Sequence, residues 1–324
     1  MPRPLFSGFL ILALVASPLQ GDEDQSGGPS RVLLVTHAGG YIHQSLLTAE
    51  QVLKKIGPKH GLQFTCYRFS GDPDAKTRIK RGNSAVETTA LEDYSARFRA
   101  RNGEPVTRKH CGRVNKETLQ RFDAVVFFTT STWSPDRGSH PLTDKELEDL
   151  ILWVKAGGSF VGVHCASDTL HNTPYGELVG AFFAGHPWVK KVEVRVEDPE
   201  HPAGKAFANG DEILHEVYQF GDKPNYPAQV PIKRQPYSRD RLHIIMSVNN
   251  RSIDVKKGNR EDGDYPISWC QRFGKGRSFY TALGHHKEIW KDPRFQEHLL
   301  GGLKWSLREL PGEATSSANL KQRK

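Results

Sequence analysis

The chain has 324 residues, of which 37% are hydrophobic and 25% are charged, as in an ordinary globular protein. This length is enough for one large α/β domain or for two smaller domains. The formal net charge is +8, but lysine and arginine are spread along the chain without a recognition motif, so we expect no nucleic-acid partner.

The N-terminal segment has the pattern of a secretory signal peptide. Arg3 supplies a positive charge, residues 5–16 form an apolar stretch too short to span a membrane, and polar residues follow. We therefore expect residues 1–21 to be removed on export and residues 22–30 to be a linker, in a secreted or periplasmic protein. The alternative is an uncleaved N-terminal anchor. After this segment, the sequence predicts no membrane span.

Short apolar runs alternate with helical patterns from residue 31 onward. Strands are predicted over residues 31–36, 64–69, 124–129, 159–164, 191–196, 243–247, 267–273 and 277–282, and helices over residues 49–56, 143–156 and 294–310. The early strands are apolar on both faces. This pattern predicts one α/β domain over residues 31–310, with a mostly parallel central sheet that helices cover on both faces.

Local signals indicate where some elements begin and end. Thr143, with Glu146 three residues later, predicts a capping box at the start of a helix. Gly157 predicts the end of that helix. Gly274 and Gly276 indicate a hairpin turn between the last two strands.

Two segments lack the alternating pattern. Residues 74–112 are highly charged, contain few aliphatic side chains and lie where a short connection would be enough. They form either a surface insertion, which we favour, or a lid that selects substrates. Residues 311–324 are polar and lack periodicity, so we expect them to form a disordered tail.

The chain contains four cysteines, Cys66, Cys111, Cys165 and Cys270. None belongs to a CxxC motif, so we expect no structural zinc site. An exported protein can form disulfides, and the three possible full pairings remain open. Buried free thiols are the alternative for Cys66 and Cys165.

Candidate functional residues follow the strands, because ligands bind outside the carboxyl ends of the strands in open parallel sheets. Histidine follows the first, fourth and last of the predicted strands, and we expect these ends to converge on one crevice. The candidates at the strand ends are Gly40, Tyr41, His43, Trp133, His164, Asp168 and His285. Gly40 lets a ligand approach the backbone closely, and the aromatic side chains of Tyr41, Trp133 and Tyr218 could stack on sugar rings.

Histidine can transfer protons near neutral pH or bind a metal ion. We therefore expect His164 and His285 to be acid–base groups or metal ligands, and His43 to be a further metal ligand or a substrate contact. Asp168 lies four residues after His164 and could orient its imidazole. Histidine with carboxylate suits a divalent metal such as zinc. The histidines lack the short spacing of a metal-binding helix, so metal-free acid–base catalysis remains an alternative.

The segment around His164 also has the layout of a nucleophile elbow, in which a strand ends in Gly-x-nucleophile and turns into a helix. Gly162-Val-His164 places histidine where serine or cysteine would stand, and Cys165 comes one position too late. The sequence therefore argues against a Cys–His glutaminase mechanism.

Several motifs resemble the ThuA-like (trehalose-utilisation) family, which belongs to the flavodoxin-like, class I glutamine amidotransferase-like group. They are residues 36–45 (THAGGYIHQS), 157–168 (GGSFVGVHCASD), 175–187 (YGELVGAFFAGHP), 216–220 (EVYQF) and 266–305. The resemblance implies a three-layer fold of that group without its cysteine nucleophile. The candidates that it matches are His43, His164, Asp168, His186, Glu216 and His285.

The resemblance also implies a role in carbohydrate utilisation. Our leading hypothesis is an exported enzyme that hydrolyses, eliminates or isomerises glycosides or keto-sugars. In this hypothesis Asp168 and Glu216 are the carboxylate partners of His164 and His285, and His186 contacts the substrate. Two alternatives are a non-catalytic sugar-binding module and a metal-dependent hydrolase of a non-sugar substrate.

Overall fold

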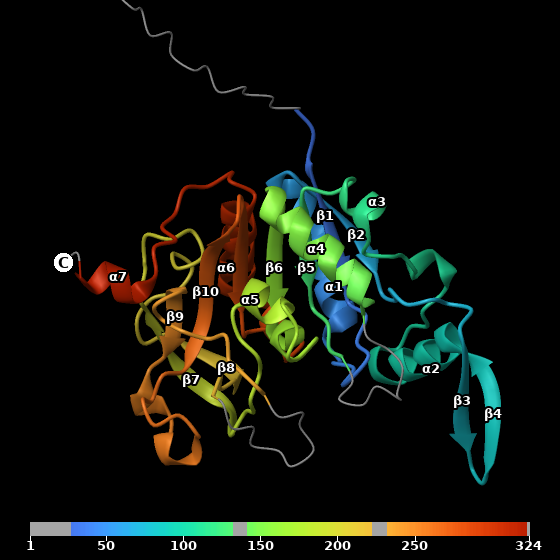
Figure 1. Cartoon of the computed structure of the whole chain (residues 1–324). Coiled ribbons are helices and arrows are strands. Elements are labelled where there is room, and N and C mark those ends of the chain that lie inside the picture. The colour runs from blue at the N-terminus through green and yellow to red at the C-terminus, as the bar shows by residue number, and fades with distance from the viewer. Residues whose placement is uncertain (1–26, 132–140, 222–231, 323–324) are drawn as a thin grey trace, which may run out of the picture.

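A mixed sheet forms the centre of the computed structural model, which describes residues 27–131, 141–221 and 232–322 (Figure 1). Its strands are β1 (Ser30–Val35), β2 (Leu62–Tyr67), β5 (Ala124–Phe127), β6 (Ser159–Val163), β7 (Trp188–Val196), β8 (Glu212–Val217), β9 (His243–Val248), β10 (Pro266–Phe273) and β11 (Gly276–Thr281). Within the described residues they lie in the order β2-β1-β5-β6-β11-β10-β9-β7-β8. The first five strands in this order are parallel to one another, and the remaining pairings are antiparallel.

Helices cover both faces of the sheet, as predicted. The helices over the body of the sheet are α1 (Leu46–Ile56), α3 (Lys116–Leu119), α4 (Asp144–Ala156), α5 (Tyr175–Val179) and α6 (Pro293–Ser306). Short 3-10 helices are η1 (Gly57–His60), η2 (Arg108–His110), η4 (His164–Ser167), η5 (Asn250–Ser252), η6 (Val255–Lys257) and η7 (Ile289–Lys291). Among the described residues, no helix is both long and apolar enough to cross a bilayer.

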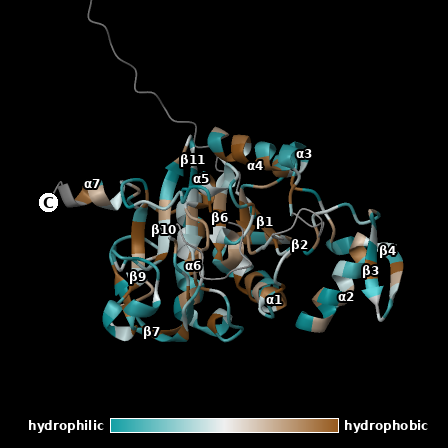
Figure 2. Ribbon diagram, turned by 60° about the horizontal axis from the view of Figure 1, so that its bottom comes forward, coloured by the Kyte–Doolittle hydropathy of each residue, from teal (hydrophilic) through white to brown (hydrophobic). Residues whose placement is uncertain are grey.

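The strand β1 shows how the apolar runs specify this arrangement. Its side chains alternate between the faces, so Val32 and Leu34 join the buried cluster beneath α1 and α6, while Leu33 and Val35 join the cluster beneath α4 and α5. Figure 2 shows hydrophobic colour on strands such as β1 and β10, and alternating colours along α4. The predicted α/β class with a mostly parallel central sheet is therefore confirmed.

The predicted turn signals are also present. The Thr143 hydroxyl accepts a hydrogen bond from Glu146 N at 3.3 Å, and the Glu146 carboxylate accepts one from Thr143 N at 2.9 Å. Gly157, at the end of α4, has a φ of 135°, which other residues rarely adopt. The hairpin between β10 and β11 closes where Phe273 pairs with Gly276.

The charged insertion at residues 74–112 has two parts. Strands β3 (Lys76–Arg81) and β4 (Ser84–Thr89) form a hairpin that projects from the body (Figure 1), as a surface insertion would. The helix α2 (Ala90–Asn102) instead packs against the body and buries Tyr94 and Phe98. The Tyr94 hydroxyl donates to the carbonyl of Thr36 and accepts from the amide of Ala38, so α2 is anchored to the loop after β1.

The C-terminal segment differs from its prediction as a disordered tail. It contains the helix α7 (Ser317–Gln322), and Ser316 and Ser317 are buried. The Ser317 amide donates to Leu242 O at 3.0 Å, and its hydroxyl accepts from Ile244 N at 2.8 Å. The segment is ordered because its polar groups satisfy backbone groups at the start of β9, which a hydropathy pattern does not reveal.

Removal of residues 311–324 tests the importance of these contacts. We expect the free energy of unfolding to fall by about 2 kcal/mol, because the Leu242 carbonyl, the Ile244 amide and the His243 ring lose their partners in the tail. Chemical denaturation of the truncated and full chains measures the difference, and removal of residues 323–324 alone is the control. Equal stability of the truncated and full chains would show that the tail contacts contribute nothing.

Candidate functional site

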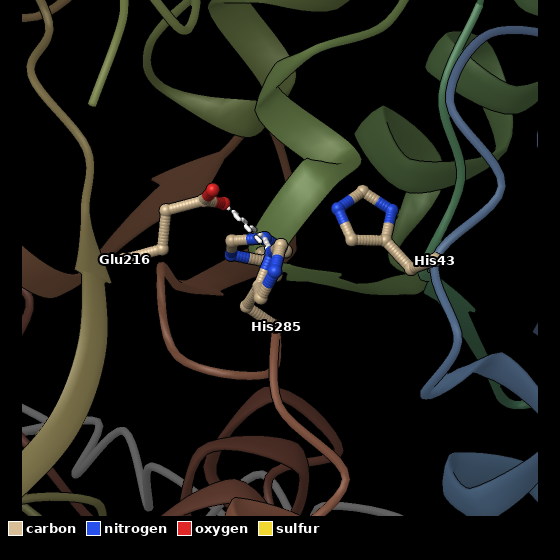
Figure 3. A group of neighbouring side chains, drawn as sticks. His43, Glu216 and His285 are labelled. Carbon is tan, nitrogen blue, oxygen red and sulfur yellow. Dashed lines mark hydrogen bonds and ion pairs between the residues drawn. The ribbon is translucent and has the colours of Figure 1, made fainter. Parts of the chain in front are cut away.

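Four side chains from distant parts of the sequence meet at one place (Figure 3). His43 lies in the loop between β1 and α1, His164 begins η4 directly after β6, and His285 follows β11. Glu216 comes from the edge strand β8. One ligand atom from each of the four lies within 4.8 Å of all the others.

The backbone at His164 turns sharply from strand to helix. Its φ is 47°, a left-handed conformation that is uncommon for a residue with a side chain. There is no room for a side chain at Gly162, because a Cβ there would lie 2.9 Å from Cδ2 of Tyr280. The arrangement is that of a nucleophile elbow with histidine at the nucleophile position.

The neighbouring Cys165 does not reach this place. Its side chain is fully buried, and burial raises the pKa of its thiol well above the usual value. Cys66, Cys111 and Cys270 are free thiols as well, so the structure contains no disulfide among its four cysteines. The Cys165 thiol is protonated and out of reach of a ligand in solution.

Hydrogen bonding determines the tautomer of His164. Its Nδ1 lies 2.7 Å from the carbonyl oxygen of Ala282, which can only accept, so Nδ1 carries the proton. The lone pair of the neutral ring is then on Nε2, which faces the other site residues. Many metal-binding histidines are oriented in this way by a backbone carbonyl.

Glu216 connects the histidines of the site. Its Oε2 lies 2.8 Å from His285 Nδ1 and 3.2 Å from His164 Nε2. Its Oε1 lies 3.3 Å from His186 Nε2. His164 Nε2 and His285 Nδ1 are themselves 3.3 Å apart. One carboxylate therefore faces three imidazoles at hydrogen-bonding distance.

Burial sets the charge state of these groups. It lowers the pKa of His164, and it lowers the pKa of His43 still further, with a contribution from the neighbouring His164. Burial alone would raise the pKa of Glu216, but its close contacts with the imidazoles of His164 and His285 hold it well below its usual range. At neutral pH the site therefore combines an ionised carboxylate with the neutral imidazoles of His43 and His164.

The donor atoms fit a divalent metal ion. Metal–ligand bonds of about 2.0–2.1 Å in a tetrahedral zinc site place neighbouring ligand atoms about 3.3 Å apart. The atoms His164 Nε2, Glu216 Oε2 and His285 Nδ1 are separated by 2.8–3.3 Å. His43 turns a further imidazole nitrogen toward these three atoms, and the four ligand atoms lie within 4.8 Å of one another. The site thus has more acceptor atoms than protons to share among them, which a cation would relieve.

Other predicted residues surround this group. The His186 side chain is 27% exposed, and the ring of the half-exposed Tyr41 lies 4.8 Å from the ring of His43. Gly40 is needed sterically, since a Cβ there would lie 2.6 Å from Ser131 O. His186 and Tyr41 are thus placed where a ligand at the four central residues would meet them.

Asp168 lies outside the group of four. Its Oδ1 is 3.6 Å from Nε2 of His171, and burial, together with the charge of Glu216, raises its pKa well above the usual value. The carbonyl of Ala282, not Asp168, has the role at His164 that we expected for this carboxylate. Trp133 lies outside the described residues.

Sequence reasoning missed two contributors to the site. The Tyr218 hydroxyl lies 2.9 Å from His164 Nε2, although the sequence suggested only a stacking role for this aromatic residue. Asn102, at the end of α2, donates to His43 O at 3.1 Å and accepts from Leu47 N at 3.2 Å. A signal for Tyr218 was available in the sequence. In the motif EVYQF, Tyr218 comes two residues after Glu216 and so lies on the same side of an extended chain. The composition of the charged insertion gave no signal for Asn102.

The insertion therefore supports the site through α2. Asn102 connects the two ends of the turn that carries His43 into α1. The guanidinium of Arg101 lies over the ring of Tyr41, 4.9 Å from its centre. Because α2 contacts the loop that carries Tyr41 and His43, we interpret it as a brace that holds this loop in place.

Comparison with known proteins agrees with this fold. The model of the ThuA family, described as trehalose utilisation, matches residues 31–306. A ThuA-like protein from Bacteroides uniformis is 18% identical with a TM-score of 0.54, and the alignment covers 90% of this chain and 95% of that one. A ThuA-like protein from Parabacteroides merdae is 15% identical with a TM-score of 0.52, over 89% and 95% of the two chains. No functionally curated protein matches the sequence.

Replacement of Asn102 tests the bracing role of α2. We expect Asn102→Ala to lower the free energy of unfolding by about 1 kcal/mol and to weaken Zn²⁺ binding several-fold, because the loop that holds His43 loses two hydrogen bonds. Isothermal titration with Zn²⁺ measures the second effect. Arg99→Ala, an exposed change on the same helix, is the control. Equal Zn²⁺ affinity of wild type and Asn102→Ala would contradict the role.

Proposed function

This chain belongs to the ThuA, or trehalose-utilisation, family, and we propose that it is an enzyme that acts on a carbohydrate with the help of a divalent metal ion. His164, His285, Glu216 and His43 would hold the ion. Membership of this family supports a carbohydrate as the substrate. The geometry of the four side chains supports a bound metal ion.

The convergence of the four ligand atoms carries this proposal. Structural acid–histidine pairs usually share a proton between two atoms, whereas here one carboxylate oxygen and two imidazole nitrogens lie at mutual distances of 2.8–3.3 Å. A mixture of imidazole and carboxylate ligands suits zinc and related divalent ions. The His285 side chain is 24% exposed, so an oxygen ligand can reach the ion from solvent.

A divalent ion at this place would polarise a sugar carbonyl or lower the pKa of a bound water, either of which suits chemistry on a glycoside or a keto-sugar. The surrounding residues have separate roles. Ala282 O keeps His164 in the tautomer that presents Nε2. His186, which contacts Glu216 at the exposed side, would exchange protons with the substrate, and the half-exposed ring of Tyr41 would contact a sugar ring.

Metal analysis of purified protein tests the proposal. We expect about one divalent ion per chain in wild-type protein that was prepared without chelator. His164→Ala should reduce the metal content by at least tenfold, because the Nε2 ligand is lost. His60→Ala, an exposed change away from the site, is the control and should leave it unchanged.

A parallel screen of glycosides and their 3-keto forms, with and without chelator, tests the reaction. Chelator should abolish turnover, and added Zn²⁺ should restore it. Turnover by a metal-free wild type would favour acid–base catalysis by the histidines instead. Sugar binding without any turnover would favour a non-catalytic binding module.

We also propose that the protein is exported, on the basis of the positively charged and apolar N-terminal segment, residues 1–21. These residues lie outside the described part of the chain. N-terminal sequencing of protein from the native host should give a mature chain that begins near Asp22. Recovery of intact Met1 from the cytoplasm would contradict export.

A further inference from the structure

The Tyr218 hydroxyl occupies the His164 lone pair that the proposed function assigns to a metal ion. Its oxygen lies 2.9 Å from His164 Nε2. Because His164 Nδ1 already donates its proton to Ala282 O, Nε2 can only accept, and the hydroxyl of Tyr218 is the donor. In this structure the Tyr218 hydroxyl is the closer of the two groups that can donate to this buried nitrogen, since His285 Nδ1 lies 3.3 Å from it.

Packing holds Tyr218 in this position. Its side chain is 3% exposed, and its ring lies 4.2 Å from that of Phe183 and 4.4 Å from that of His164, centre to centre. A buried ring packed against two other rings does not swing away easily, so the accessible motion is rotation of the O–H bond about the C–O bond. The oxygen atom itself stays close to His164 Nε2.

A metal ion and the tyrosine proton cannot share this nitrogen, because neutral imidazole has a single lone pair on Nε2. Building on the proposed function, we propose that Tyr218 has two roles. It caps His164 Nε2 in the absence of a cation, and it donates a hydrogen bond to the oxygen of the bound ligand once a cation has taken Nε2.

The position of the hydroxyl supports the second role. The Tyr218 oxygen and the Glu216 carboxylate both contact His164 Nε2, so both would border an ion bound there. A buried hydroxyl that loses its hydrogen-bond acceptor needs another acceptor. A carbonyl or hydroxyl oxygen of a sugar at the ion supplies one, and a purely nitrogen or sulfur ligand supplies none of comparable strength. Tyr218 therefore selects for an oxygen ligand.

The test uses Co²⁺ as the metal and acetohydroxamate as an oxygen ligand, with visible absorption of the bound Co²⁺ as the signal. We expect Tyr218→Phe to bind Co²⁺ roughly three- to tenfold more tightly than wild type, because no hydrogen bond has to be broken. The same variant, loaded with Co²⁺, should bind acetohydroxamate about tenfold more weakly. Tyr175→Phe, which removes a buried hydroxyl bonded to Ala166 O elsewhere, should change neither.

The outcomes separate this inference from the proposed function. Weaker Co²⁺ binding by Tyr218→Phe, or unchanged acetohydroxamate affinity, would overturn the role of Tyr218 while leaving the metal site intact. Absence of Co²⁺ and Zn²⁺ binding by the wild type would overturn both. If Tyr218→Phe does not fold, the near-ultraviolet difference spectrum of wild-type protein decides: addition of Zn²⁺ must show the change expected for a buried tyrosine hydroxyl that exchanges its acceptor.

Discussion

The hydrogen bond from His164 Nδ1 to Ala282 O is the interaction on which the site depends. The register of the sheet creates it, because β6 and β11 pair in parallel up to Val163 and Thr281, and the next residue of each strand takes part in the bond. The left-handed turn at His164 directs the side chain, rather than the backbone, at this carbonyl. The tautomer, the direction of Nε2 and the contacts of Nε2 with Glu216 and Tyr218 all follow from this geometry.

Sequence patterns were sufficient to predict those elements whose structure depends on their own local sequence. The apolar runs predicted the parallel strands, and the strand ends predicted that His43, His164 and His285 would meet. Glu216 could not be placed in this way. It lies on β8, an antiparallel edge strand that the pattern did not reveal, and only the family resemblance pointed to it. The order of the tail depends on long-range backbone bonds such as that of Ser317, which leave no periodic signal.

The charged insertion at residues 74–112 shows how a segment that looks like solvated surface can support a site. Its composition suggested a solvated surface, and the β3–β4 hairpin has that character. The next helix, α2, instead buries Tyr94 and Phe98, and its last residue, Asn102, bonds to the backbone on both sides of the loop that ends in α1. A charged segment can therefore be a structural part of a site when two or three of its side chains face inward.

The site is an arrangement that folding alone would not favour. Burial of a carboxylate, several imidazoles and a tyrosine hydroxyl is unfavourable unless each polar atom finds a partner. A packed apolar cluster at the end of the parallel strands would be more stable. Residues that reduce stability at one place, held by a strained turn at His164, are characteristic of sites that bind a ligand. Under the proposed function, the ligand would provide a positive charge at the centre of the four side chains, and an oxygen acceptor for Tyr218 once that charge has taken His164 Nε2.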